Sequence, residues 1–388
     1  MDGKETIYDS SKELFEETAS REKFKSNIFT ELMLDYSTDM SVREASRRLN
    51  RIRWESIGIS AQTYRNTVER EGAAINEVID ERCFEVLQEN GFGINGQLDE
   101  NSEFTPETSQ YIKAEEIIRA MENLNIKKAH VSDYESEEIA VDISVDDVCV
   151  KRQTEIRPRG ELEQPKKVNN TVIHVENVKG KYILNAGSVF GALRLLIGFL
   201  LCVGLLRKHL VFFTDGAREI HNEIARLFRF ANYKIILDWY HLKKKCKEQL
   251  SMALKNATIR NEFLEELLPC LWFGNINGAI KLLQNIDPKK VKNFEFITKL
   301  VEYFERVRAY VPCYALRKEL GLRNSSNLGE KSNDLIVSSR QKNNGMSWSD
   351  DGSHSFASVS AVYRNHQLSN WAHSRSINFD FVPFDEAV

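Results

Sequence analysis

The sequence predicts an α/β protein with a mixed sheet, preceded by a helical N-terminal region and interrupted by an all-helical block. Two observations carry this prediction. Segments of strand-like alternation and of helical spacing follow one another between residues 135 and 240, in the order strand, strand, strand, helix, strand, helix, strand. Residues 241–322 then have helical spacing throughout, as an insertion or a separate helical lobe would.

The composition is that of a globular protein. Of the 388 residues, 42% are hydrophobic and 28% are charged, and the formal net charge is −4, so any nucleic-acid surface has to be local. The six cysteines include no CxxC pair, which we interpret as reduced thiols in a cytoplasmic protein. The acidic, polar N-terminus is unlike a signal peptide. Charges at Arg194, Arg207 and Lys208 interrupt the longest apolar stretch, which predicts a buried helix rather than a membrane span.

A helical N-terminal domain is predicted at residues 1–92, with two helices joined by a turn at about 41–72. Ser41 with Glu44 forms a capping box, Gly58 allows a turn, and Ser60 can cap the second helix. This pattern resembles a helix-turn-helix. Five arginines make a local basic patch, for which DNA binding and a solvated helical hairpin are the two interpretations: Arg43, Arg47, Arg48, Arg51 and Arg53.

The sheet is predicted to begin after a linker and helix at residues 93–134. In EEIAVDISVDDVCVKRQ, apolar residues occupy one face of a strand, and Asp142, Ser144 and Asp146 occupy the other. A hairpin turning at Lys179–Gly180 follows. The first part of the core, 135–240, then continues with helix 188–206, strand 209–214, helix 216–230 and strand 233–238. The last part is expected at 323–375, followed by a poorly ordered tail at 376–388.

Two aspartates follow apolar strands, Asp146 at the end of the first and Asp215 at the end of the fourth. If these strands are neighbours, the carboxylates converge at one edge of the sheet, where a third carboxylate from a helix would complete an acidic cluster. Like charges at close range repel unless a cation neutralises them, and carboxylate oxygens suit Mg²⁺ or Mn²⁺. Two such ions about 4 Å apart can activate a nucleophilic oxygen and stabilise the leaving oxygen of a phosphodiester. For each aspartate, capping of the following turn or helix is the alternative interpretation.

Four stretches taken together resemble the DDE transposases of bacterial insertion sequences: SVDDVCVKRQ, FFTDGAREIH, DWYHLKKK and SSNLGEKSNDLIVSSRQK. That family belongs to the RNase H-like superfamily, and the resemblance is greatest to its Mutator-like branch, which carries a C/DxxH motif. It covers roughly residues 135–355. It implies Asp146, Asp215 and Glu330 as catalytic and metal-binding residues, with Asp238 and His241 as the accessory C/DxxH pair. Asp147 competes with Asp146, and Glu319 with Glu330, but strand alternation and turn context favour Asp146 and Glu330.

The resemblance also implies an activity. An RNase H-like core with two Mg²⁺ or Mn²⁺ ions would cleave double-stranded DNA at the ends of an insertion sequence. The freed 3′-OH would then attack target DNA in the same site. Recognition of terminal repeats, a homo-oligomer and a cytoplasmic bacterial protein acting at the nucleoid, without a membrane, are implied too. The alternatives are a nuclease without strand transfer and a domesticated DNA-binding regulator that is not an enzyme.

Several residues near the predicted site have two interpretations. Arg340 and Lys342 follow the helix of Glu330 and are predicted to hold DNA phosphates, as are the lysines of HLKKKCK unless these form a solvated helix face. Trp239 and Tyr240 are either core aromatics or stack on an unpaired base. His241 is either a structural hydrogen-bonding residue or orders Asp238 or the DNA end. A zinc site of Asp238, His241 and Cys246 has suitable spacing but lacks a clear fourth ligand.

Overall fold

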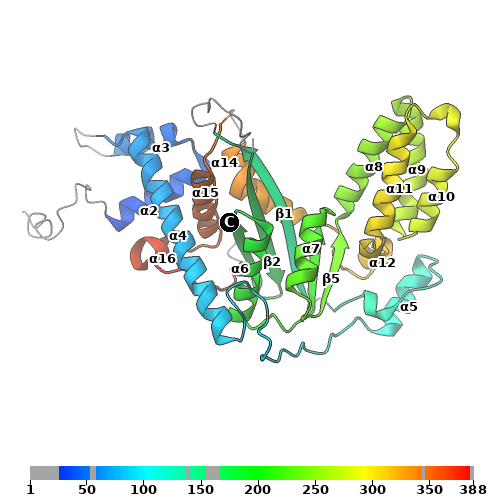
Figure 1. The fold of residues 1–388 in the computed structure, drawn as a ribbon, viewed down its shortest axis with the longest axis horizontal. Coiled ribbons are helices and arrows are strands. Elements are labelled where there is room, and N and C mark those ends of the chain that lie inside the picture. The colour runs from blue at the N-terminus through cyan, green and yellow to red at the C-terminus, as the bar shows by residue number, and fades with distance from the viewer. Residues whose placement is uncertain (1–25, 53–57, 137–139, 154–166, 343–345, 385–388) are drawn as a thin grey trace, which may run out of the picture.

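A five-stranded mixed sheet stands at the centre of the computed structural model, which describes residues 26–52, 58–136, 140–153, 167–342 and 346–384 (Figure 1). Its strand order is β3-β2-β1-β4-β5. The β1–β2 and β2–β3 pairs are antiparallel, whereas the β1–β4 and β4–β5 pairs are parallel. This confirms the predicted α/β class with a mixed sheet. The strands are β1 (Val141–Lys151), β2 (Lys167–Asn177), β3 (Gly180–Ala186), β4 (Leu210–Thr214) and β5 (Tyr233–Leu237).

Strand β1 extends beyond its parallel neighbour. It pairs with β4 only as far as Ser144, while along β2 it continues to Lys151. Val148 and Val150 continue the alternation and are buried, which keeps the strand going. Asp146 therefore lies within β1 rather than at its end, which corrects our expectation. Its level on β1 is the level at which β4 has already ended.

The two faces of the sheet pack against different helices. On one face Val141, Ile143 and Val145 share a core with α6 (Val189–Cys202) and α7 (Arg218–Leu227). The other face of β1 carries the polar residues. It lies against α13 (Asn327–Asn333), which continues through the π-helical turn η4 (Asp334–Ser338) into α14 (Ser339–Gln341). Helix α15 (Asp350–Arg364) covers β2 and β3 beside them.

A lobe of helices occupies the β5 side of the sheet (Figure 1). Its apolar stripes recur at helical spacing, as with Leu242, Cys246 and Leu250 in α8, and they form one core with Val211 and Phe213 of β4. Three asparagine N-caps start its helices. Its elements are α8 (Trp239–Ala253), α9 (Ala257–Trp272), α10 (Ile276–Gln284), η2 (Pro288–Lys290), α11 (Phe294–Val307), η3 (Arg308–Tyr310) and α12 (Tyr314–Glu319).

The N-terminal helices lie on the opposite side: α2 (Asn27–Asp39), α3 (Val42–Ile52) and α4 (Ala61–Glu89). Asn50 closes the turn between α3 and α4, donating to the carbonyl of Ile59 at 2.9 Å and accepting from its N–H at 2.7 Å. Helix α4 runs unbroken through Gly72, where an added Cβ would lie 2.3 Å from the carbonyl oxygen of Ser355 on α15. The glycine thus permits a close helix crossing.

The predicted boundary after residue 92 does not separate two cores. Tyr64, Val68 and Ile75 of α4 are buried in one cluster with Val150 of β1 and Phe356 of α15. The N-terminal helices are therefore packed into the body that carries the sheet. The helix-turn-helix remains a prediction, and Arg53 lies outside the described residues.

The remaining segments wrap the edges of the molecule. Helix α5 (Ala114–Asn123) and η1 (Val131–Asp133) precede β1, and α5 packs against α12. After α16 (Leu368–Ser374), residues 376–384 were expected to form a loose tail. Instead Phe379 and Phe381 are buried against Phe199 of α6, and Val382 forms an antiparallel bridge with Lys181. The aromatic residues explain this packing, because each buries a large apolar area. None of the described helices combines the length and apolar character needed to cross a membrane.

Candidate active site

Three aspartates stand at one level on three neighbouring parallel strands: Asp146, Asp215 and Asp238. Two residues before each of them, the parallel register aligns Ser144, Phe213 and Ile236. This register follows from the burial of Val211, Phe213 and Ile236, because a shift by one residue would turn the apolar side chains to the other face. The carboxylates therefore converge where β4 and β5 end.

Asp215 begins a tight turn between β4 and α7. Its Oδ1 accepts a hydrogen bond from the N–H of Ala217 at 2.8 Å. Gly216 has a φ of +86°, and an added Cβ would lie 2.9 Å from Cδ1 of Leu237, so both conformation and space require glycine. Arg306 of the helical lobe donates to the carbonyl of Gly216 at 2.9 Å. The DG pair of the sequence thus holds a half-buried carboxylate at the mouth of a cleft.

Asp146 lies on the face of β1 that α13 covers. Its Oδ2 accepts from the amide of Asn333 at 2.6 Å. Burial raises the pKa of Asp146, and the negative charge of Asp215 raises it further, while Asn333 and His241 lower it. Asp147, the competing candidate, accepts instead from the hydroxyl of Thr171 at 2.9 Å on β2. These contacts group Asp146 with Asp215, His241 and the helix of Glu330, which favours Asp146 as the first acidic residue.

Glu330 reaches the site on α13 and forms an ion pair with Nε2 of His241 at 2.8 Å. The helix lies close to β1 because residue 329 is a glycine: an added Cβ there would be 2.5 Å from the Cβ of Ser144. Glu319 is elsewhere, on α12, where it accepts from Asn123 of α5 at 3.0 Å. The structure therefore favours Glu330 as the late glutamate.

Asp238 is fully buried and connects the two elements that carry His241 and Glu330. Its Oδ1 caps α8 by accepting from the N–H of His241 at 2.8 Å. Its Oδ2 accepts from the hydroxyl of Ser326, the residue that starts α13, at 2.9 Å and also from the N–H of Ser326. One carboxylate thus fixes the beginnings of both helices.

Ligand atoms for a cation gather here. Asp238, His241 and Glu330 each offer one such atom, and these atoms lie within 4.8 Å of one another. Because both oxygens of Asp238 already accept hydrogen bonds, we regard Asp238 as the support of this group rather than its ligand. The group fits a hard divalent cation. Its donors are carboxylate oxygens, and the buried Oδ1 of Asn333 beside them has no hydrogen-bond partner among the described residues.

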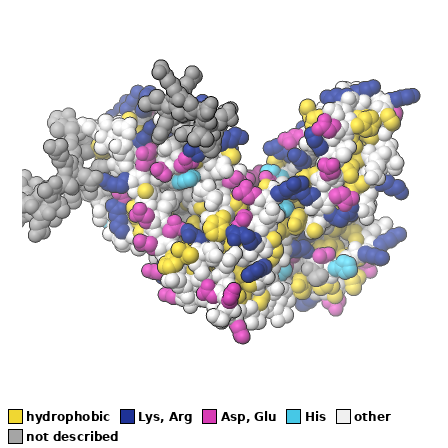
Figure 2. All heavy atoms as spheres, in the orientation of Figure 1, with side chains coloured by type: hydrophobic (Ala, Val, Ile, Leu, Met, Phe, Trp, Pro, Cys, Tyr) yellow, Lys and Arg dark blue, Asp and Glu magenta, His cyan; other side chains and the backbone are white. Residues whose placement is uncertain are grey.

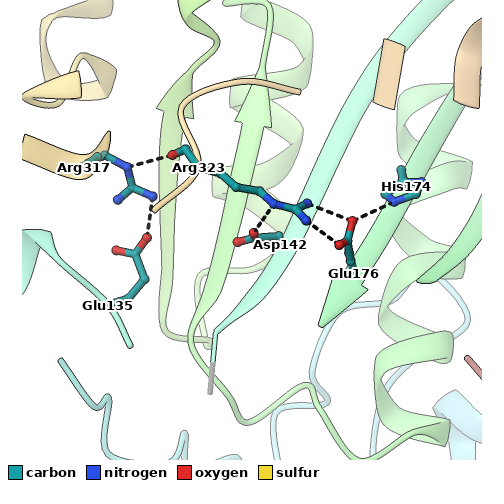
Figure 3. Close-up of polar contacts among 6 residues, drawn as sticks. All are labelled: Glu135, Asp142, His174, Glu176, Arg317 and Arg323. Carbon is teal, nitrogen blue, oxygen red and sulfur yellow. Dashed lines mark hydrogen bonds and ion pairs between the residues drawn. The ribbon is translucent and has the colours of Figure 1, made fainter. Parts of the chain in front are cut away.

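A polar network holds the segment before α13 against the sheet (Figure 3). Arg323 contacts both carboxylate oxygens of Glu176 on β2, one of them at 2.8 Å, and Asp142 on β1 at 3.4 Å. His174 bonds Glu176 at 3.3 Å and Ser332 of α13 at 2.9 Å. Burial would raise the pKa of Glu176, but the bonds from His174 and Arg323 outweigh it and lower it to about 2. The helix of Glu330 is thereby tied to β2 at both of its ends.

A second pair extends the network to the helical lobe. Arg317 of α12 donates to Glu135 at 2.7 Å and to the carbonyl of Arg323 at 3.0 Å, and the Arg317 and Glu135 side chains are 1% and 2% exposed (Figure 3). Burial alone would raise the pKa of Glu135, but the charge and hydrogen bond of Arg317 lower it. The lobe is therefore connected rigidly to the segment that leads to Glu330.

A cleft with basic walls opens beside Asp215 and His241, between the α7 turn and the lobe. Its volume is about 580 Å³. Figure 2 shows the molecule hollowed between the sheet and the lobe, with acidic, histidine and basic side chains on the walls. Four cations of the lobe and one of α7 line the cleft, with Glu248 and Glu302 among them: Arg218, Lys244, Lys245, Lys299 and Arg306. The sequence drew attention to Lys244 and Lys245, whereas Lys299 and Arg306 gave no signal because they come from α11.

The predicted phosphate-binding pair divides. Lys342 is exposed. Arg340 is 5% exposed, donates to the carbonyl of Ser37 at 3.1 Å, and lies over the rings of Trp348 and Phe356 at 5.3 and 5.1 Å. This placement argues against the DNA contact predicted for Arg340, because its guanidinium is used within the protein. On α3, the described members of the basic patch are exposed: Arg43, Arg47, Arg48 and Arg51.

The aromatic and cysteine alternatives are also placed. Trp239 packs against Trp272 and is a core residue, whereas Tyr240 is 51% exposed, with its ring 5.7 Å from that of His241. Cys246 is fully buried in the apolar core of the lobe, which raises the pKa of its thiol. A zinc site that includes Cys246 is therefore not supported.

The comparisons with known proteins are weak. No family model matches the chain, and no curated protein matches it. Among solved structures, the chain is similar to the strand transfer complex of the Drosophila P element transposase, with 9% identity, a TM-score of 0.28, and coverage of 95% of this chain and 85% of that one. It is also similar to the Mos1 transposase paired-end complex, with 12% identity, a TM-score of 0.18, and coverage of 73% and 97%. Scores this low carry no argument about function, which has to rest on the site.

Proposed function

We propose that the protein is a DDE transposase of the RNase H-like superfamily, which cleaves the ends of an insertion sequence and joins them to target DNA. The observation that carries this proposal is the convergence of Asp146 and Asp215 at one level of the parallel strands, with Glu330 brought beside them through His241. The strand order and the position of the helical lobe between β5 and α13 support the fold assignment. The bacterial origin and the C/DxxH branch rest on the sequence motifs.

The residues fit divalent metal ions. Asp146, Asp215 and Glu330 would hold two Mg²⁺ or Mn²⁺ ions, which supply activation of a nucleophilic oxygen and stabilisation of the leaving oxygen of a phosphodiester. His241 holds Glu330 in place before binding, and Asp238 fixes His241 and the start of α13. The turn at Gly216 keeps the second oxygen of Asp215 directed away from the strand pairs and open to the cleft.

The cleft supports DNA as the substrate. Lys244 and Lys245 on α8 and Arg306 on α11 present positive charge next to the carboxylates, where the phosphates that flank a scissile bond would lie. Binding to an end-bearing duplex should weaken with salt. Replacing Lys244 and Lys245 by alanine should lower the slope of log affinity against log salt by about one for each lysine. Lys289 and Lys290, exposed on η2 away from the cleft, provide the matched control pair.

The rest of the proposed assembly follows from the role. The exposed arginines of α3 would contact the terminal repeats, and Lys342 would contact DNA near the site. Two ends have to be brought together, so we expect a homo-oligomer on DNA.

The activity test uses a duplex carrying the inverted repeats that flank the gene, with Mg²⁺ present or chelated. We expect Mg²⁺-dependent cleavage, and strand transfer when a pre-cut end is supplied. Asp146→Asn and Glu330→Gln should abolish both reactions, whereas the neighbouring Asp147→Asn and the distant Glu319→Gln should retain them.

Each other outcome has a defined meaning. Cleavage without transfer of a pre-cut end would replace the proposal with a nuclease. Specific binding without cleavage in any divalent ion would replace it with a DNA-binding regulator. Full activity of Asp215→Ala would overturn the metal site itself.

A further inference from the structure

An asparagine that no sequence motif indicated lies next to the first acidic residue. Asn333 is the last residue of α13 and is 4% exposed. Its Nδ2 donates to Oδ2 of Asp146 at 2.6 Å. Its Oδ1 is buried and has no hydrogen-bond partner among the described residues. Leaving a buried carbonyl oxygen unpaired costs about 1–3 kcal/mol, so such an atom beside a charged cluster requires an explanation.

The backbone directs Asn333 and Glu330 to the same place. The two residues are three positions apart, so their side chains lie on one face of α13. Gly329 brings that face within contact distance of β1 at Ser144. The helix changes to a π-helical turn immediately afterwards, at Asp334. Such turns occur often at functional sites, where they alter the direction of the following side chains.

The two ends of the carboxamide suit two tasks. The amide nitrogen is a donor and stabilises the charged form of Asp146, opposing the rise in its pKa that burial causes. The carbonyl oxygen is an acceptor and can only be satisfied by a donor or a cation. Amide carbonyl oxygens are ordinary ligands of hard divalent cations.

We infer that Asn333 is a fourth residue of the metal site, orienting Asp146 through Nδ2 and offering Oδ1 as a neutral oxygen donor to the cation. This inference rests on the proposed function. It predicts that the affinity for the ion depends on Asn333 even though the residue carries no charge. Residues that support a metal site in this way typically contribute 10–100-fold to affinity, so Asn333→Ala should weaken binding about tenfold or more.

The test measures the binding of Mn²⁺ to the full chain, by the loss of the free-ion paramagnetic resonance signal, and the rise in melting temperature that the ion causes. Asn327→Ala is the matched control, because Asn327 is on the same helix but exposed. Asn333→Asp separates a ligand from a structural residue. Without metal it places a carboxylate against Asp146 and lowers the melting temperature, whereas with Mn²⁺ it supplies a charged oxygen, so the rise on binding should exceed that of the wild type.

The outcomes separate the inference from the function on which it rests. Wild-type protein that binds no Mn²⁺ would overturn both. Wild-type binding that Asn333→Ala leaves equal to Asn327→Ala would overturn the inference and leave the transposase proposal standing. An Asn333→Asp variant whose rise in melting temperature equals that of Asn333→Ala would also overturn it, because Asn333 would then act only in packing.

Discussion

Replacing Asp238 by alanine should disturb two helices at once. The carboxylate accepts from the N–H of His241 and from both the N–H and hydroxyl of Ser326, and it is fully buried. A hydrogen bond to a charged group contributes about 1.5–3 kcal/mol net. Removing the charge also relieves its desolvation, which offsets part of the loss. We therefore expect Asp238→Ala to lower the free energy of unfolding by about 3 kcal/mol, near the upper range for single substitutions.

Thermal unfolding in the absence of divalent ions measures this effect, with Asn256→Ala as the reference. Asn256 caps α9 by accepting from the N–H of Ile259 at 2.9 Å, and it is exposed. Losing that cap should cost about 1 kcal/mol. Asp238→Ser divides the two roles, because serine can cap α8 but is too short to hold Ser326 as well. It should recover part of the melting temperature.

The affinity for Mn²⁺ provides the second measurement. Asp238→Ala and Asp238→Ser should both weaken binding, since His241 and Glu330 lose their common support, while Asn256→Ala should leave it unchanged. A decrease in melting temperature no greater than that of Asn256→Ala would refute the reasoning. So would unaltered Mn²⁺ affinity in Asp238→Ala, because Asp238 would then be an ordinary helix cap.

Three further predictions follow from the same contacts. Burial raises the pKa of Asp142 from 3.8 to about 7, against the lowering effect of Arg323 and Arg317, so between these pH values the folded state keeps a proton that the unfolded state has lost. Stability is lost across that window as pH rises, and Asp142→Asn should gain melting temperature over the wild type at pH 8 but not at pH 4; an equal difference at both would contradict this. Gly329→Ala puts a Cβ 2.5 Å from that of Ser144 and should weaken Mn²⁺ binding while circular dichroism stays unchanged, and intact affinity would show that α13 is not held by this contact. Arg317→Met leaves Glu135 buried and unpaired, so thermal unfolding should show a loss of about 3–5 kcal/mol, which Glu135→Leu in the same chain should partly restore.

Local patterns predicted the sheet and the positions of the acidic residues. The alternation in β1 placed Asp142, Ser144 and Asp146 on the polar face, and contacts with α13 are made by Asp146 on that face. The DG pair marked a turn that only glycine permits. These features are encoded within a few residues of one another, so spacing and residue type were sufficient.

The contacts that sequence reasoning missed join residues far apart in the chain. Arg340 looked like a surface cation because Ser37, more than three hundred residues earlier, could not be seen as its partner. The segment 376–384 looked like a tail because Phe379 and Phe381 pack on α6 rather than on their neighbours. Asn333 had no signal of its own, since an amide three residues after a glutamate is common on helix surfaces. In each case tertiary packing decided the role.

The comparison of Asp215 with Asp238 shows why similar positions acquire different roles. Both follow an apolar parallel strand, stand at the same level of the sheet, and accept a hydrogen bond from the backbone just after them. They differ in what covers them. Ser326 closes over Asp238 and uses its second oxygen, so that carboxylate is satisfied and excluded from water. No segment closes over Asp215, which lines the cleft among cations. A carboxylate with an open oxygen can exchange water for an ion, whereas one with both oxygens bonded and no exposure cannot, so the metal belongs with Asp215 and the structural role with Asp238.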